Sequence, residues 1–262
     1  MILLSSFLSS AHEKELRERE RERARERMKE ERLDYVLVPL GLLVFGVYHL
    51  WFLFTIIRFP RRTVIGLNAE IRRLWVSSMM ADPLKNGALA VQTIRNNIMA
   101  STLLATAAIA LSSLIGVFVC STSDPSNISS KLVYGNQTSL ISSIKYLCIL
   151  LCYLLAFLFN VESIRYYAHV SLLSTVSNLK NNSQAIEYVA RNLNRGSYFW
   201  SLGLRAYYLS FPLFLWIFGP IPMFASCCLM LVLLYFLDTT TSFTRHLHLQ
   251  SMKQDSSSNV VE

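Results

Sequence analysis

Four long apolar segments constrain this chain of 262 residues more than any other feature. They cover residues 35–57, 98–120, 144–165 and 207–237. A helix rises ~1.5 Å per residue, so about 20 apolar residues cross a hydrocarbon core ~30 Å thick. Backbone polar groups inside a bilayer must be satisfied within the segment, which favours helices. The sequence therefore predicts an all-α, integral membrane four-helix bundle.

Charged residues are concentrated outside these segments. They make up only 16% of the chain, against about 25% in soluble domains. Residues 1–32 largely alternate Glu and Arg, so we expect a tail that is helical or disordered and packs no core. Residues 33–238 form the membrane domain, and 239–262 are expected to be a disordered C-terminal tail.

The net charge of +8 indicates a partner of opposite charge. Outside the N-terminal tail the basic residues lie beside apolar segments, so we expect anionic lipid headgroups and not nucleic acid. The five cysteines lie in or at the ends of apolar segments, where packing explains them better than disulfides or zinc. No catalytic constellation is visible near the membrane face, so we expect no cofactor and lean against an enzyme.

The connections between the apolar segments are predicted to be helical. In 68–80, Ile71, Leu74 and Trp75 share one face, which predicts an amphipathic helix lying at the membrane surface. Asp82-Pro83 fits the start of a helix that runs into the second span. The third span should continue past the membrane face, and breaks are expected around 178–183 and 194–197.

The fourth apolar segment is interrupted by Gly219-Pro220-Ile221-Pro222. Proline lacks a backbone donor and clashes with the preceding turn, so a kink or break is expected near Gly219. A break could expose carbonyl groups to an ion, as in transporters with discontinuous helices, and a simple kink is the alternative.

Small residues mark two faces of the second span. The residues recur every four positions, as Ala108, Ser112 and Gly116 on one face and Thr102, Thr106 and Ala110 on the other. Such faces let helix backbones approach closely in lipid. They predict that this span is the packing centre and a contact for a homo- or hetero-oligomer.

The distribution of Lys and Arg predicts the orientation. The loops after spans one and three hold seven and five, while the loop after span two and the C-terminal tail hold four. This places the loops after spans one and three in the cytosol and both termini outside. The nine basic residues of the N-terminal tail oppose this orientation. The sequons at Asn127 and Asn136 fall in the outer loop, which predicts N-glycosylation in the plasma membrane or an endomembrane.

Several motifs together resemble a known family. They are Tyr48-His49-Leu50-Trp51, Thr63-Val64-Ile65-Gly66-Leu67-Asn68, Arg72-Arg73-Leu74-Trp75-Val76, Ala90-Val91-Gln92-Thr93-Ile94-Arg95-Asn96, Met99-Ala100-Ser101-Thr102, Arg165-Tyr166-Tyr167-Ala168-His169-Val170 and Phe218-Gly219-Pro220. The chain resembles a family of uncharacterised multi-pass membrane proteins, a domain of unknown function common in plants and also found in bacteria. The resemblance covers about 33–238 and implies a four-helix membrane architecture without assigned catalytic or binding residues.

His49 is the candidate polar site within the membrane. It stands nine positions before Arg58, which is ~13 Å along a helix. Ionisable residues at such depth face the bundle interior and often mark an ion or proton path. The alternative is a neutral histidine that hydrogen-bonds to a neighbouring helix.

A second candidate site is a cytosolic pocket for an anion or lipid headgroup. Its predicted residues lie near the cytosolic ends of spans two and three and in the first loop: Arg72, Arg73, Arg95, Asn96, Arg165 and His169. Guanidinium groups bind phosphate oxygens bidentately, which motivates the assignment. Helix anchoring and loop docking are the alternative role for these residues.

Two functional hypotheses follow. The first is a non-enzymatic helical bundle that binds lipid or partner proteins at its cytosolic face. The second is a small transporter or channel subunit that uses His49.

Overall fold

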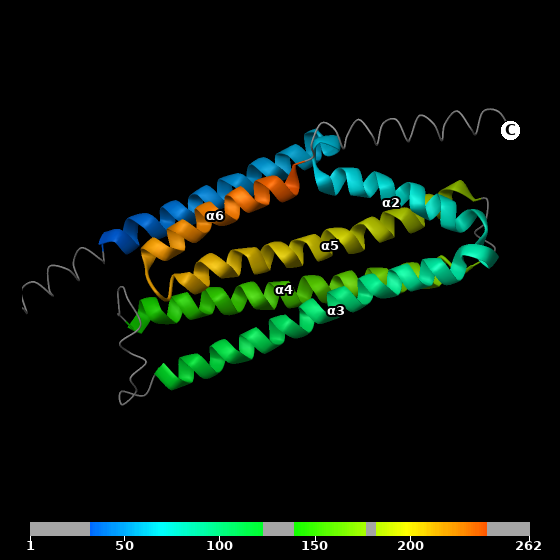
Figure 1. Ribbon diagram of the computed structural model, residues 1–262. Coiled ribbons are helices and arrows are strands. Elements are labelled where there is room, and N and C mark those ends of the chain that lie inside the picture. The colour runs from blue at the N-terminus through cyan, green and yellow to red at the C-terminus, as the bar shows by residue number, and fades with distance from the viewer. Residues whose placement is uncertain (1–31, 123–138, 177–181, 240–262) are drawn as a thin grey trace, which may run out of the picture.

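The computed structural model describes residues 32–122, 139–176 and 182–239, and within them nearly all residues are helical (Figure 1). The chain begins with the N-terminal helix, Arg32–Arg58. It continues through η1 (Pro60–Arg62), α2 (Val64–Ala81), α3 (Pro83–Thr122), α4 (Ser139–Leu173), α5 (Ser183–Leu215) and α6 (Pro220–Asp238). Asn127, Asn136, residues 1–31 and residues 240–262 lie outside the described residues, so the predictions for them stay predictions.

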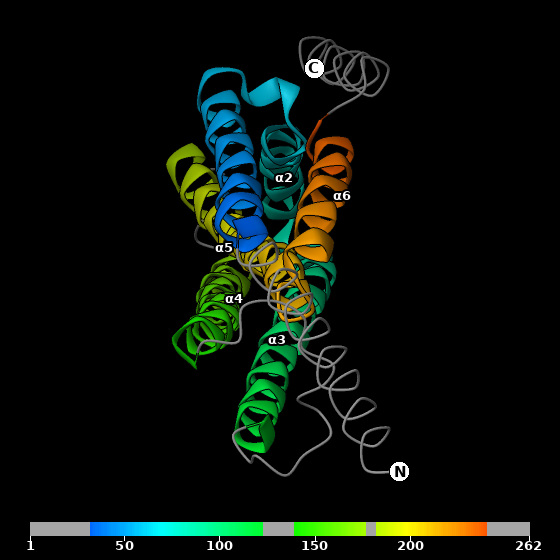
Figure 2. The same cartoon turned by 90° about the vertical axis from the view of Figure 1, so that its left-hand side faces the viewer.

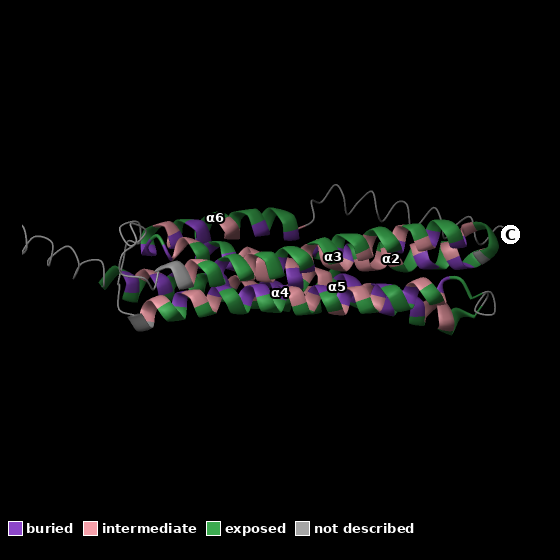
Figure 3. Ribbon diagram, turned by 90° about the horizontal axis from the view of Figure 1, so that it is seen from below, coloured by how far each residue is buried: buried purple, intermediate pink, exposed green. Residues whose placement is uncertain are grey.

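Four helices are long and apolar enough to cross a membrane. They are Arg32–Arg58, Leu84–Val119, Ile141–Leu173 and Pro220–Asp238. This confirms the predicted all-α membrane fold, and the protein is a multi-pass membrane protein. Large apolar side chains are exposed on the outer faces, as lipid contact requires, and the buried residues lie on the inner faces (Figure 3).

The segment 207–237 is divided between two helices and is not one span. α5 ends at Leu215 and α6 begins at Pro220. Gly219, the residue before α6, has a φ of 144° that only glycine adopts readily, and Pro220 fits the first helical position. The kink or break expected near Gly219 is therefore a break, at which the chain turns back.

This turn gives the bundle a fifth long helix and separates the two ends of the described chain. Trp216, just after α5, donates from Nε1 to Asp34 Oδ1 over 3.3 Å, at the start of the N-terminal helix. At the other end of the bundle Thr239, just after α6, forms an isolated β-bridge with Thr63. The first and last described residues thus lie at opposite ends of the N-terminal helix, and the side of the membrane on which each tail lies stays a prediction.

α5 is the central helix of the bundle. It lies between the pair formed by the N-terminal helix and α6 and the pair formed by α3 and α4 (Figures 1 and 2). It contacts α2, α4 and α6. The two faces of small residues on α3 differ only in part: on the first, Ala108 is fully buried, Ser112 is half-buried and Gly116 is exposed. On the second, Thr102, Thr106 and Ala110 are all exposed.

The core has two parts, one in the membrane and one at the end where α2 lies, called here the α2 end. The membrane core includes Ala108, Ile149, Ala156, Leu213 and Met223. The core at the α2 end joins α2, α3, α4 and α5 through Val76, Met80, Ile94, Tyr167, Val170, Val189, Ala190 and Leu193. The bundle therefore continues as a packed unit beyond the apolar spans.

This second core includes the inner face of α2. The amphipathic helix predicted over 68–80 lies within α2, which runs alongside α3 and α5 (Figure 1). Its position at the membrane surface stays a prediction. α4 has 35 residues and reaches about 52 Å, well past a ~30 Å hydrocarbon core. α3 starts at Pro83 and runs without a break through the second span. These extensions, both predicted, provide the apolar surface on which the inner face of α2 packs.

Candidate functional site

A cavity of about 360 Å³ lies between the N-terminal helix, the start of α2 and α5. Its wall is largely apolar and is formed by His49, Phe52, Leu53, Ile56, Ile65, Tyr198, Ser201, Leu202 and Arg205. Leu53, Tyr198 and Leu202 are also exposed on the outside of the bundle. The cavity can therefore be reached from the surrounding lipid.

His49, the predicted membrane polar site, is one of the polar groups on this wall. Its Nδ1 lies 2.9 Å from the carbonyl oxygen of Phe45, one turn earlier in the same helix. A carbonyl only accepts, so Nδ1 carries the proton and Nε2 of the neutral ring is an acceptor. The observed partner of His49 is thus its own helix and not a neighbouring one.

Arg205 is the second polar group on the wall, and sequence reasoning missed it. Its Nη2 lies 2.6 Å from Oδ1 of Asp238, with side-chain exposures of 14% and 9%. Tyr48 donates to Oδ2 of Asp238 over 2.8 Å. The Arg205 guanidinium also lies over the ring of Phe52, 4.3 Å from its centroid. This Arg205–Asp238 cluster ties α5 and α6 to the N-terminal helix.

One donor of the Arg205–Asp238 cluster remains unsatisfied. Nη1 of Arg205 is buried and has no hydrogen-bond acceptor among the described residues. A buried donor without a partner costs free energy, which an acceptor on a bound molecule would recover. Asp238 balances the charge of Arg205.

The comparisons with known proteins add the family. The family model described as "Protein of unknown function, DUF599" matches residues 36–243. The chain belongs to the DUF599 family. The match confirms the resemblance and includes every residue that lines the cavity. Searches of curated proteins and of solved structures found no match.

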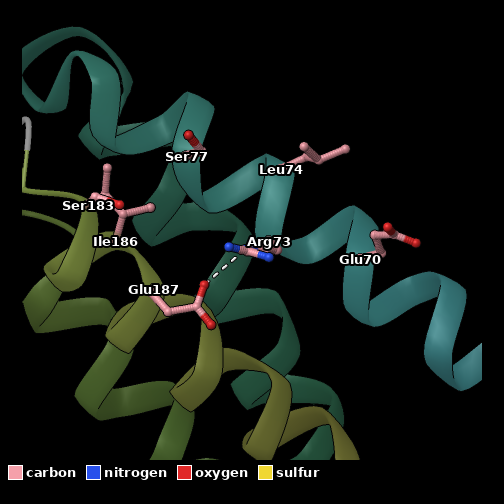
Figure 4. A pocket seen from close by; sticks show the side chains of 7 residues that line it. All are labelled: Glu70, Arg73, Leu74, Ser77, Ser183, Ile186 and Glu187. Atoms are coloured by element: carbon pink, nitrogen blue, oxygen red, sulfur yellow. Dashed lines mark ion pairs between the residues drawn. The ribbon is translucent and has the colours of Figure 1, made fainter. Parts of the chain in front are cut away.

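The six residues predicted for a cytosolic anion site do not line one pocket of the DUF599 protein. Arg73 pairs with Glu187 of α5 over 2.9 Å. The two side chains point toward each other across a groove of about 400 Å³ between α2 and α5 (Figure 4). Glu70, Leu74, Ser77, Ser183 and Ile186 complete the groove. An acidic partner already balances the charge of Arg73.

The predicted residues on α3 and α4 are exposed. Arg95 donates to Oε1 of Gln92 over 2.7 Å, and Arg165 pairs with Glu162 over 2.6 Å. Nε2 of His169 lies 3.3 Å from the hydroxyl of Tyr188, and Asn96 is exposed beside Arg95. These positions agree with surface anchoring, and a role in anion binding stays a prediction for them.

Arg72 differs from the other five because it points into the bundle. It lines a separate cavity of about 160 Å³ with Asn97, Ala100, Tyr167, Ser197 and Trp200. The described residues contain no group of three or more His, Cys, Asp or Glu side chains placed to hold a metal.

Proposed function

We propose that this DUF599 protein is a non-enzymatic membrane protein that binds a lipid in the cavity between the N-terminal helix and α5. The observation that carries the proposal is the largely apolar, laterally accessible wall, behind which the Arg205–Asp238 cluster lies. Ligand sites in proteins share this composition, with apolar walls and a few oriented polar groups.

The position of the cavity favours a lipid over a water-soluble ligand. Its wall includes residues 49–56 of the N-terminal helix, which is long and apolar enough to span the membrane. That span ends at Arg58, at the α2 end. Because the lining residues of this helix lie within nine positions of Arg58, or ~13 Å, we expect the cavity within one leaflet. An acyl chain would fill such an apolar cavity.

Lipid retention after purification tests this proposal. Ser201→Trp should fill the cavity from α5, and Leu103→Trp, at an exposed leucine on α3, is the matched control. Native mass spectrometry should find bound lipid on the wild type and on Leu103→Trp, with at least a tenfold loss for Ser201→Trp. Equal retention by all three proteins would contradict the proposal.

A small transporter or channel subunit is the second candidate. It is favoured by the location of His49 and Arg205 on one cavity wall. Reconstituted vesicles should then show an ion flux that His49→Ala changes. A flux that this variant leaves unaltered would exclude a role of His49 in transport.

A further inference from the structure

We propose that the cavity at Arg72 binds a phosphate-type oxyanion. The cavity lies between α2, α3, α4 and α5, at the α2 end of the bundle. It is distinct from the cavity beside His49, in which we propose lipid binding. On α5, Ser197 and Trp200 line the Arg72 cavity, whereas Ser201 and Arg205 line the cavity beside His49. The proposal does not depend on lipid binding beside His49.

Arg72 is held in place without being neutralised. Its Nε donates to Oδ1 of Asn194 over 2.7 Å, and Nδ2 of Asn194 donates to the carbonyl of Ala69 over 3.2 Å. No carboxylate among the described residues pairs with Arg72, although the adjacent Arg73 has Glu187. The Arg72 cavity therefore contains a fixed cation that lacks a counter-charge.

Burial makes this arrangement costly without a bound anion. It lowers the pKa of the Arg72 guanidinium from its ordinary value, because the charged form loses water. An arginine stays protonated even so, and the unfavourable loss of hydration persists. An anion in contact with the free edge of the guanidinium would offset it through charge-assisted hydrogen bonds.

Trp200 supplies a second donor that lacks an acceptor. Its Nε1 is buried and has no hydrogen-bond partner among the described residues, and the side chain lines the same cavity. An indole N–H can only donate. Asn97 adds an amide, Ser197 and Tyr167 add two hydroxyls that hydrogen-bond to each other, and none of the lining residues is acidic. The wall is therefore rich in donors, as an oxyanion requires.

The volume limits the ligand. A cavity of about 160 Å³ equals the liquid volume of roughly five water molecules at ~30 Å³ each. That space fits one tetrahedral oxyanion. The phosphate group could belong to a lipid headgroup or to a free ion, because both present the same oxygens.

The test uses the full chain in detergent and follows its melting temperature during titration with inorganic phosphate, with chloride at matched ionic strength as the reference. The wild type should show a saturable rise. Arg72→Gln and the conservative Trp200→Phe should weaken the apparent affinity at least tenfold. Arg73→Gln, which removes the neighbouring exposed charge, should titrate like the wild type.

A second arm distinguishes the source of the phosphate. The same proteins are placed in phosphatidylcholine nanodiscs with or without phosphatidic acid. A rise in melting temperature that needs phosphatidic acid and Arg72, without a response to inorganic phosphate, assigns the site to a lipid headgroup. If neither phosphate source gives a response that Arg72→Gln and Trp200→Phe both weaken, the proposal is overturned. Arg72→Lys keeps the charge and replaces the variant at this position if Arg72→Gln does not fold.

Discussion

Arg205 and Asp238 form a largely buried ion pair, with 2.6 Å between Nη2 and Oδ1. In the sequence they flank opposite ends of one apolar segment, which as a single straight helix would place them ~50 Å apart. They meet because α5 and α6 are antiparallel across the break at Gly219. The pair thus fastens the two halves of that segment together beside Tyr48 of the N-terminal helix.

Breaking this pair should destabilise the protein strongly. Asp238→Asn removes the counter-charge and leaves Arg205 buried and unpaired, which costs about 3–5 kcal/mol in comparable pairs. Thermal unfolding in detergent measures the effect. Glu187→Gln, which breaks the exposed pair with Arg73, is the control and should cost under ~1 kcal/mol. Equal losses in the two variants would show that the Arg205–Asp238 pair has no special role.

The double variant Arg205→Leu with Asp238→Leu separates pairing from burial. Replacing both charges removes the unpaired group, so the double variant should be more stable than Asp238→Asn alone. If the double variant is less stable than Asp238→Asn, the polar contacts themselves hold α5 and α6 together.

The sequence was informative where length and apolar composition decide the structure. Segments 35–57, 98–120 and 144–165 each lie within a long helix, because an apolar run of this length has few alternatives in a bilayer. It was insufficient at Gly219, since Gly-Pro permits either a kink or a reversal and only packing chooses between them. The break expected around 194–197 is absent from α5. There Gly196 allows close contact with Tyr167, to which an added Cβ would approach within 2.9 Å.

The candidate site was predictable only where a residue stands out from its local sequence. His49 is conspicuous as an ionisable residue inside an apolar span, and it lines the cavity between the N-terminal helix and α5. Arg205 has no comparable signal, because it precedes the apolar segment and reads as a loop residue. Its pairing with Asp238 depends on the chain reversal, which no local pattern specifies.

Gly219→Ala should destabilise the turn between α5 and α6. At a φ of 144° and ψ of 171° an alanine is strained, at a cost of about 1–3 kcal/mol. Thermal unfolding should show this loss. Gly46→Ala is the control, because an added Cβ there meets nothing within 4 Å. A Gly219→Ala protein as stable as Gly46→Ala would mean that the turn adopts another conformation.

Gly203→Ala should disturb the packing between α4 and α5. The added Cβ would lie 2.6 Å from Nδ2 of Asn160, a fully buried side chain that donates to Ala156. Overpacking of this kind typically costs about 1–3 kcal/mol. Gly116→Ala, with no atom within 4 Å of the added Cβ, should be tolerated. Combining Gly203→Ala with Asn160→Ala should recover part of the loss, and strictly additive losses would contradict direct contact.

The course of the chain also predicts that its two tails lie on opposite sides of the membrane. With both termini outside, the side of the α2 end holds twelve Lys and Arg residues and the other side thirteen. If Arg245 and Lys253 of the C-terminal tail lie on the side of the α2 end, the numbers become fourteen and eleven. The α2 end then faces the cytosol, in agreement with the preference for basic residues there. The sequons at Asn127 and Asn136 follow α3 and fall on the opposite side.

Glycosylation mapping with a C-terminal epitope tests this arrangement. We expect a mobility shift that disappears in the double variant Asn127→Gln with Asn136→Gln, and an epitope that protease reaches only from the cytosolic side. A chain with four crossings would place the epitope on the same side as the glycans. The two outcomes are exclusive, since α6 ends beside Thr63, where α2 begins, only if α5 and α6 run in opposite directions across the break at Gly219. An epitope on the glycan side would therefore refute the antiparallel arrangement of α5 and α6.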